Sequence, residues 1–160
     1  MTATPSMTIE PFRPADQAEV KRLVLAGLAE HWGALDPAKN PDLNDIASTY
    51  AGDSFLVARQ NGKIVGTGAL VPRDEGSVEI VRMSVAKGAR RTGIGLAVLH
   101  ALCGRAAARG FRRVVLETTE TWHEVISFYL VYGFQITHRQ DGDVYFALDL
   151  EIVPASEGIG

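Results

Sequence analysis

Residues 81–95 decide the fold of this chain, and they read Val81-Arg82-Met83-Ser84-Val85-Ala86-Lys87-Gly88-Ala89-Arg90-Arg91-Thr92-Gly93-Ile94-Gly95. The stretch runs from a strand, through a basic loop, into a helix. A helix N-terminus offers unpaired N–H groups and a partial positive charge, so a phosphate group can be held there. Small glycines let a ligand approach the backbone, and the arginines add charged donors. We therefore expect a pyrophosphate site, with a plain turn and solvated arginines as the alternative.

Strands and helices can be placed outward from this stretch by the spacing of apolar residues and by turn signals. Asn61-Gly62 is typical of a hairpin because both positions tolerate positive φ. Thr92 and Gly110 are expected to begin and end the helix that follows residue 92. Helices are expected from about Asp16 to 31–33, and over 43–50, 93–109 and 125–132. Strands are expected at 8–12, 55–59, 63–71, 77–85, 112–118, 134–137 and 144–151.

This order predicts an α/β (α+β) fold whose mixed, mostly antiparallel sheet is flanked by helices. One parallel step is expected, around the helix at 93–109. The 160 residues fit one domain, with an ordered core of about 7–152 and loose tails.

Composition excludes several classes of protein. The net charge of −3 argues against a nucleic-acid partner, which needs a basic surface. Cys103 is the only cysteine, so the chain forms no internal disulfide and no cysteine-based metal cluster, and no metal is expected. With no apolar run long enough for a membrane span and no leader-like start, we expect no membrane association and a cytoplasmic location.

Two motifs carry a resemblance to a known family. Arg90-Arg91-Thr92-Gly93-Ile94-Gly95 resembles the coenzyme A signature Gln/Arg-x-x-Gly-x-Gly/Ala of the GCN5-related N-acetyltransferase (GNAT) family. Residues 128–134, with Tyr129 and Gly133-Phe134, resemble its second motif, a Tyr followed by three residues and Gly-Phe. The resemblance covers residues 8–150. It implies an N-acetyltransferase that moves an acetyl group from acetyl-CoA to a primary amine of a small molecule or peptide by direct attack in a ternary complex. A non-catalytic acyl-CoA-binding sensor on the same fold is the alternative.

The same resemblance implies which residues hold the cosubstrate. The pantetheine arm would pair with the strand backbone of Met83, Ser84 and Val85. The pyrophosphate would bind the loop and helix start, residues Arg90, Arg91, Thr92, Gly93, Ile94 and Gly95. Trp122 stands where the family usually has an Asn, so it either contacts the cofactor arm in its place or shapes the acceptor pocket.

Two residues are predicted to be catalytic. Glu79 is the first candidate for the base that deprotonates the amine, because strand alternation places it on one face with Val81, Met83 and Val85. Its alternative is an exposed or paired carboxylate, with Arg82 as one such partner. Tyr129 is the candidate acid for the departing sulfur, and its alternative is an aromatic packed on the sheet. Glu117 and His123 are alternative bases. A bulge near residues 83–85 would aim a backbone N–H at the oxyanion.

The acceptor side is expected near Glu30, His31 and Trp32, with Glu117, because acidic and aromatic groups suit a cationic amine. An acidic set, Asp36, Asp42 and Asp45, follows them, and a solvated loop is the alternative. A dinucleotide-binding enzyme is disfavoured because Gly93-Ile94-Gly95 lacks the third turn glycine and follows a hairpin. The identity of the amine and a homodimeric state stay open.

Overall fold

The computed structural model describes residues 7–32, 39–50 and 53–150, and of His31 and Trp32 it describes only the backbone. The predicted tails, at 1–6 and from 154 onward, lie outside these residues. The chain divides into two compact units, which we call unit 1 (residues 1–70 with 81–102) and unit 2 (residues 71–80 with 103–160). Each is described by itself, and a single domain stays a prediction.

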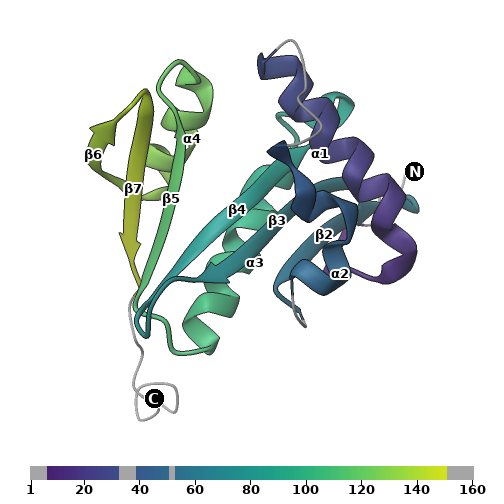
Figure 1. Ribbon diagram of the computed structural model, residues 1–160, viewed down its shortest axis with the longest axis horizontal. Helices are drawn as coiled ribbons and strands as arrows, with labels where there is room; N and C mark the ends of the chain where they lie inside the picture. The colour runs from purple at the N-terminus through teal and green to yellow at the C-terminus, as the bar shows by residue number, and fades with distance from the viewer. Residues whose placement is uncertain (1–6, 33–38, 51–52, 151–160) are drawn as a thin grey trace, which may run out of the picture. The chain divides into compact units, whose positions relative to one another are not determined.

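The described strands form one sheet in the order β1-β2-β3-β4-β5-β7-β6 (Figure 1). Their bounds are β1 Met7–Pro11, β2 Phe55–Gln60, β3 Lys63–Pro72, β4 Ser77–Val85, β5 Arg113–Thr119, β6 Gln135–Gln140 and β7 Asp143–Asp149. β4 pairs with β5 in parallel through residues 77–79, whereas β1–β2, β2–β3, β5–β7 and β6–β7 are antiparallel. The predicted mixed sheet with a parallel step at the β4–β5 crossover is confirmed.

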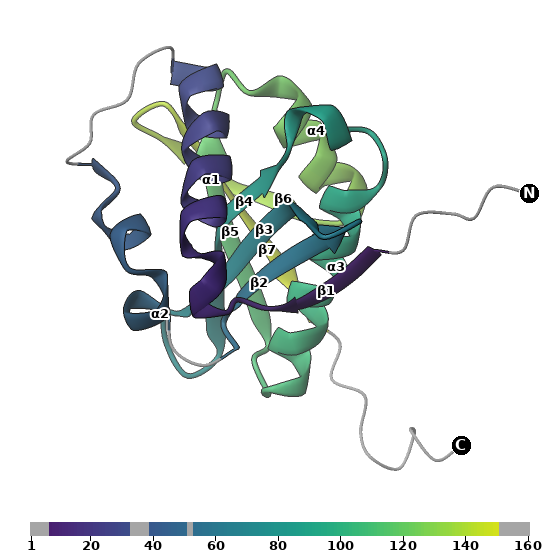
Figure 2. The same cartoon turned by 90° about the vertical axis from the view of Figure 1, so that its right-hand side faces the viewer.

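In unit 1, helices cover both faces of the strands β2 and β3, as Figure 2 shows. Helix α1 (Gln17–Trp32) packs Val20 and Val24 against Phe55 and Val57, and the short η3 (Pro41–Asn44) and α2 (Ile46–Thr49) join this core. Helix α3 (Ile94–Ala108) lies on the other face. The core in this unit is therefore two-sided.

Helix α3 approaches β3 at two glycines. A Cβ on Gly66 would lie 2.8 Å from Ile94 Cγ2, and a Cβ on Gly68 would lie 2.6 Å from Leu102 Cδ1. Neither distance is compatible with ordinary contact between carbon atoms, which is about 3.5–4.0 Å. The absence of a side chain at these two positions thus sets the spacing between helix and strand.

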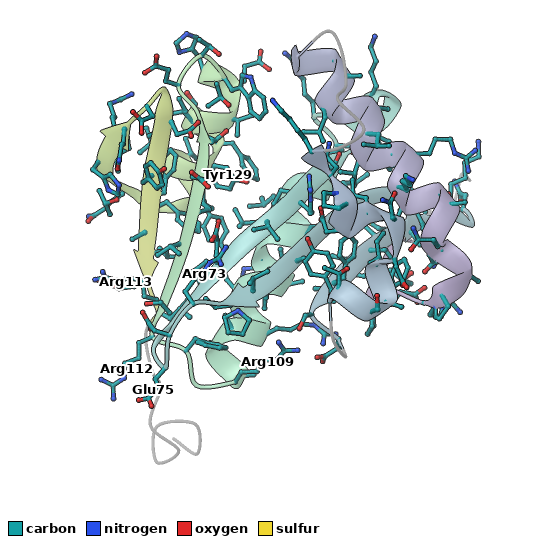
Figure 3. All side chains as sticks on the ribbon, viewed as in Figure 1. Arg73, Glu75, Arg109, Arg112, Arg113 and Tyr129 are labelled. Atoms are coloured by element: carbon teal, nitrogen blue, oxygen red, sulfur yellow. The ribbon has the colours of Figure 1, made fainter. Side chains whose placement is uncertain are left out.

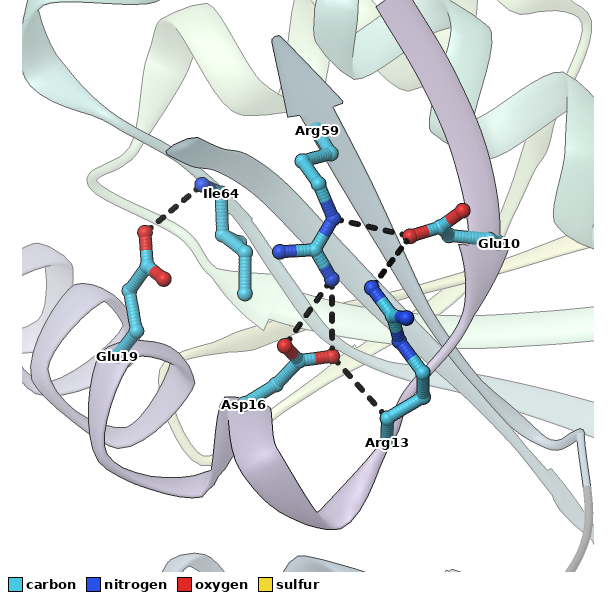
Figure 4. Close-up of polar contacts among 6 residues, drawn as sticks. All are labelled: Glu10, Arg13, Asp16, Glu19, Arg59 and Ile64. Atoms are coloured by element: carbon cyan, nitrogen blue, oxygen red, sulfur yellow. Dashed lines mark hydrogen bonds and ion pairs between the residues drawn. The ribbon is translucent and has the colours of Figure 1, made fainter. Parts of the chain in front are cut away.

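A partly buried ionic cluster joins the residues just before α1 to the sheet (Figure 4). Arg59 NH2 donates to both Asp16 oxygens at 3.0 Å, and Arg59 Nε donates to Glu10 at 2.9 Å. The Asp16 side chain is 7% exposed, so these bonds compensate for the loss of its water. Glu19 of α1 accepts from the Ile64 N–H at 2.8 Å, beside the register shift between β2 and β3.

Unit 2 is built on β5, β7 and β6, with helix α4 (His123–Tyr132) against them. The Tyr129 ring lies 5.6 Å from Phe134 and 5.7 Å from Phe146, between ring centroids. Gly133, at φ 128°, ends α4, and its N–H donates to the carbonyls of Tyr129 and Leu130. Aromatic packing therefore fixes the helix on the sheet.

Most predicted elements are confirmed to within two or three residues. Asn61 and Gly62 have φ values of 53° and 80°, as the predicted hairpin requires, and Gly110 ends α3 at φ 88°. The predicted helix over 43–50 is two shorter pieces, η3 and α2. No helix in the described ranges is long and apolar enough to cross a membrane.

Candidate active site

The predicted phosphate loop lies in unit 1, between β4 and α3. Arg91 and Gly93 both have left-handed backbones, with φ values of 64° and 88°. Turns of this kind can line up successive N–H groups in a concavity that suits an anion. The Gly93 carbonyl accepts the first helical bond, from Ala97, so Gly93 and not Thr92 sits at the cap. The Thr92 hydroxyl instead donates to the Ala89 carbonyl.

This helix start presents the groups that an anion needs. Helix α3 begins at Ile94, so the N–H groups of Ile94, Gly95 and Leu96 precede the first intrahelical donor. A Cβ on Gly93 would meet nothing within 4 Å, so its surroundings are open. The backbone N–H groups at this end of α3 can therefore donate hydrogen bonds directly to a phosphate group.

Arg90, predicted to bind phosphate, already holds a carboxylate in this structure. Its two terminal nitrogens donate to the two oxygens of Glu30 at 2.5 and 2.7 Å, and its Nε lies 3.4 Å from the Val85 carbonyl. The structure thus joins a residue predicted for the acceptor side to one predicted for the cofactor. Both side chains are 37% exposed, so the pair stays within reach of a ligand.

A groove of about 630 Å³ lies beside this ion pair, between α1 and the segment that leaves β4. This volume is in the range of small-molecule sites. Its charged lining residues are Glu19, Arg22, Glu30, Lys87 and Arg90, and its apolar lining includes Leu23, Ala26 and Val85. All of these residues belong to unit 1.

The strand β4 departs from simple alternation at Arg82, whose φ is 56°. Val81 packs against the α1 side of the core. Met83 has its sulfur on the α3 side, where a Cβ on Gly68 would lie 2.8 Å away. The prediction that Val81 and Met83 share a face is therefore wrong, because one left-handed residue between them changes the phase of the strand.

Arg82 is held by a network that the sequence did not reveal. It donates to Asp42 through Nε at 2.9 Å and through NH2 at 2.6 Å, and the Tyr50 hydroxyl donates to Asp42 at 2.7 Å. Burial alone would raise the pKa of Asp42, but the bonds from Arg82 and Tyr50 outweigh it and lower that pKa. Burial and Asp42 raise the pKa of Tyr50 to about 12.

The acidic set expected on the acceptor side is largely used within the fold. Asp42 is paired with Arg82, and Asp45 caps α2 by accepting from the Ser48 N–H at 3.2 Å. Asp36 lies outside the described residues, as do the side chains of His31 and Trp32. Of the predicted acceptor residues in unit 1, only Glu30 is therefore placed.

Glu79 lies in unit 2 on β4, opposite Val115 of β5. Its side chain is 15% exposed, and its Oε1 accepts from Arg73 Nε at 2.5 Å and also contacts Arg73 NH2. The partner is therefore Arg73, the residue that follows β3, and not Arg82. Both contacts use one oxygen, and within the described ranges Oε2 has no protein donor.

Tyr129, labelled in Figure 3, is 6% exposed. Its ring contacts those of Phe128, Phe134 and Phe146. Burial, with a smaller effect of Cys103, raises the pKa of its phenol far above the ordinary range. No hydrogen bond is found for the phenol oxygen among the described residues, which also contain no fully buried polar side-chain atom without a partner. The oxygen is therefore the part of Tyr129 that reaches the surface, where a ligand can bond to it.

The other candidate residues near Tyr129 in unit 2 differ in their surroundings. Tyr132 is half-buried and is hydrogen-bonded to Cys103, and burial raises the pKa of these groups to about 12 and about 11. Trp122 is the half-buried cap residue of α4 and makes no side-chain cap bond. His123 is exposed on the first turn of that helix.

Glu117, predicted as an alternative base, lies on the exposed face of β5. It faces Tyr145 across the β5–β7 pair, and the Tyr145 hydroxyl is hydrogen-bonded to it. His138 stacks on Tyr145 with ring centroids 4.2 Å apart. Alternation along 113–119 predicts this exposure of Glu117, but the stacked pair depends on β6 and β7 and was not predicted.

The described residues contain no group of three or more His, Cys, Asp or Glu that could hold a metal ion.

Comparison with known proteins identifies the family of the chain. The family model described as Acetyltransferase (GNAT) family matches residues 20–134. The chain is 34% identical to an IAA acetyltransferase of Azospirillum brasilense, over 81% of this chain and 85% of that protein. It is 30% identical to human N-acetyltransferase 8B, over 74% of this chain and 56% of that protein. The chain spans about half the length of this and the other vertebrate relatives it matches.

Solved structures share the fold. A GNAT-family acetyltransferase of Staphylococcus aureus superposes with a TM-score of 0.83 at 22% identity, covering 91% of this chain and 100% of that one. PaiA N-acetyltransferase of Thermoplasma acidophilum, solved with coenzyme A, gives 0.78 at 14% identity, covering 91% and 99%. GNAT enzymes use acetyl-CoA as the acetyl donor. This chain belongs to the GNAT family of acetyltransferases.

Proposed function

We propose that this acetyltransferase transfers the acetyl group of acetyl-CoA to a primary amine of a small molecule or peptide, by direct attack in a ternary complex. The observation that carries the proposal is Tyr129, an enclosed tyrosine whose hydroxyl has no hydrogen-bond partner among the described residues and reaches the surface. An aromatic residue that served packing alone would not need a hydroxyl there, because Phe would bury the same ring without a polar atom.

The cosubstrate would be held mainly by unit 1. The N–H groups at the start of α3, with Arg90, Arg91 and Thr92, would bind the pyrophosphate, and the backbone of Met83, Ser84 and Val85 would pair with the extended arm. When bound, acetyl-CoA supplies an acetyl group activated as a thioester. The open surroundings of Gly93 and the left-handed turns at Arg91 and Gly93 support this assignment.

Glu79 would serve as the base. The amine nitrogen forms the new C–N bond while the C–S bond breaks, and one proton must leave the nitrogen. Glu79 Oε2 would accept that proton directly or through water, while Oε1 stays with Arg73. The Arg73 contact would hold the carboxylate in one orientation. Glu117 and His123 are more exposed, which makes them weaker candidates for a positioned base.

Tyr129 would act on the leaving sulfur. Its raised pKa keeps the phenol protonated at all ordinary pH values, so it is always a hydrogen-bond donor. A thiol of pKa about 8.5 leaves as a thiolate that cannot remove so tightly held a proton. We therefore assign Tyr129 the role of stabilising the thiolate by donation, with the final proton coming from water.

The test uses the full chain and separates cofactor binding from turnover. Acetyl-CoA is titrated by calorimetry, and thiol release is followed against a panel of small amines, amino acids and peptide N-termini, with the acetylated product identified by mass. Glu79→Gln is expected to lower kcat by about 10²–10⁴-fold with unchanged acetyl-CoA affinity. Tyr129→Phe is expected to lower kcat by about 10–100-fold, the value of a hydrogen bond to a charged group.

Tyr132→Phe is the matched control, since it removes a hydroxyl from the same helix and is expected to leave kcat within about twofold. Binding of acetyl-CoA without turnover of any amine would instead favour the sensor alternative. Absence of binding would refute the assignment of residues 90–95.

A further inference from the structure

Arg82 has a backbone conformation that its place in a strand does not explain. Among the described residues, four that are not glycine have positive φ, and three of them, Asn61, Arg91 and Asp141, lie in turns. The fourth is Arg82, inside β4, at φ 56°. A side chain disfavours this conformation, so the surrounding structure must hold it.

Both ends of Arg82 are held. The Thr67 hydroxyl of β3 donates to the Arg82 carbonyl at 2.7 Å, and Thr67 is fully buried. At the other end, the guanidinium makes its two bonds to Asp42 at 2.6 and 2.9 Å. Tyr50 completes the arrangement by donating to the same carboxylate at 2.7 Å. We call Arg82, Asp42, Tyr50 and Thr67 the β4 clamp.

The β4 clamp acts on the segment proposed to meet the cosubstrate. Arg82 immediately precedes Met83, and its left-handed φ changes the direction in which the following peptide groups point. The change of face between Val81 and Met83 is the visible result. A left-handed residue inside a strand costs free energy, and strain of this kind is often found where function requires a particular backbone direction.

We infer that the β4 clamp is a positioning device that fixes the backbone N–H groups of residues 83–85 toward the acetyl thioester. The inference rests on the proposed function, and it makes Arg82 and Thr67 positioning residues, not catalytic ones. The clamp acts through the backbone, so its loss should lower turnover more than it weakens binding of the distant pyrophosphate end.

The sharpest test is the pair Thr67→Val and Thr67→Ser. Valine has nearly the shape of threonine and lacks only the hydroxyl, whereas serine retains it. Thr67→Val is expected to lower kcat at saturating acetyl-CoA about tenfold or more, with calorimetric affinity for coenzyme A within threefold of wild type. Thr67→Ser is expected to retain kcat within threefold.

A second pair separates backbone from side chain at Arg82. Arg82→Gly tolerates the left-handed φ but loses the clamp, and Arg82→Ala loses the clamp while still disfavouring that φ. The alanine variant is expected to have a kcat below that of the glycine variant, by about threefold or more. A purely structural role would make both equally active once folded, as judged by circular dichroism.

Wild-type kcat in folded Thr67→Val and Arg82→Gly would overturn the inference while leaving the proposed function intact. Inactive wild-type protein that binds no acetyl-CoA would instead refute the proposed function. If the Arg82 variants do not fold, the Thr67 pair alone decides the inference.

Discussion

Replacing Gly68 with alanine tests whether the contact between β3 and α3 is as close as the structure shows. The added Cβ would lie 2.6 Å from Leu102 Cδ1, 2.8 Å from Met83 Sδ and 3.1 Å from Val98 Cγ1. Ordinary contacts are about 3.5–4.0 Å, so the nearest neighbours must retreat by about 1 Å. Leu102 and Val98 are fully buried and have little room to do so.

The magnitude follows from two opposing effects. Overpacking of this kind costs about 1–3 kcal/mol. Removing a glycine from a strand returns about 0.5–1 kcal/mol of backbone entropy. We therefore expect Gly68→Ala to lower the free energy of unfolding by about 1–2 kcal/mol, roughly a five- to thirtyfold change in the folding equilibrium.

The assay is urea unfolding at equilibrium, followed by circular dichroism and fluorescence. Gly104→Ala in α3 is the matched control, because its Cβ would meet nothing within 4 Å. That change should raise stability by about 0.5–1 kcal/mol. Adding Leu102→Ala to Gly68→Ala should cost less than the sum of the single changes, because the two sites share one space. A Gly68→Ala protein at least as stable as wild type would refute the close approach.

Two further predictions concern the ionic and phenolic groups of unit 1. Arg59→Leu should lower the free energy of unfolding by about 3 kcal/mol in chemical denaturation, because it leaves the buried Asp16 carboxylate without its main partner. The control Arg113→Leu, which breaks an exposed pair with Asp149, should lower it by less than about 1 kcal/mol. Equal losses in the two variants would contradict the reasoning. The pKa of Tyr50 is raised to about 12 in the folded protein, against about 10 in the unfolded chain. The contribution of Tyr50 to the free energy of unfolding is therefore fully present below pH 10 and is lost as the pH rises toward 12. The free energy of unfolding, measured from pH 9 to 12, should therefore fall less steeply in Tyr50→Phe than in wild type. Parallel curves for the two proteins would contradict the raised pKa of Tyr50.

The order of elements could be predicted from the sequence because each depends on nearby residues. Asn61-Gly62, Gly110 and Gly133 have the left-handed backbones that mark a hairpin and two helix ends, and all three were expected. The parallel step also followed, since a helix of the length of α3 separates two strands. Signals of this kind predict structure well because they depend on the conformation of one or two residues and not on distant contacts.

The site was less predictable because its contacts join distant residues. Arg82 is paired with Asp42, which lies forty residues earlier in the chain. Arg82 also has the left-handed backbone that interrupts the expected alternation of side chains along β4. Glu79 is paired with Arg73 across the β3–β4 turn, a partner that charge alone could not select among the arginines. The spacing Gly66-Thr67-Gly68 is a usable signal, because paired glycines in a strand indicate close approach by a helix.

The rate at which Cys103 is labelled by a thiol reagent can report local opening of this protein. Cys103 is the only thiol in the chain, it is 6% exposed, and burial raises its pKa to about 11. Only an exposed thiolate can attack a disulfide reagent and displace its thiol, so at pH 8 the folded protein should react very slowly. Released coenzyme A can then be counted against a negligible background. The slow labelling that remains measures how often the surroundings of Cys103 in unit 2, including its contact with Tyr132, open enough to expose the sulfur.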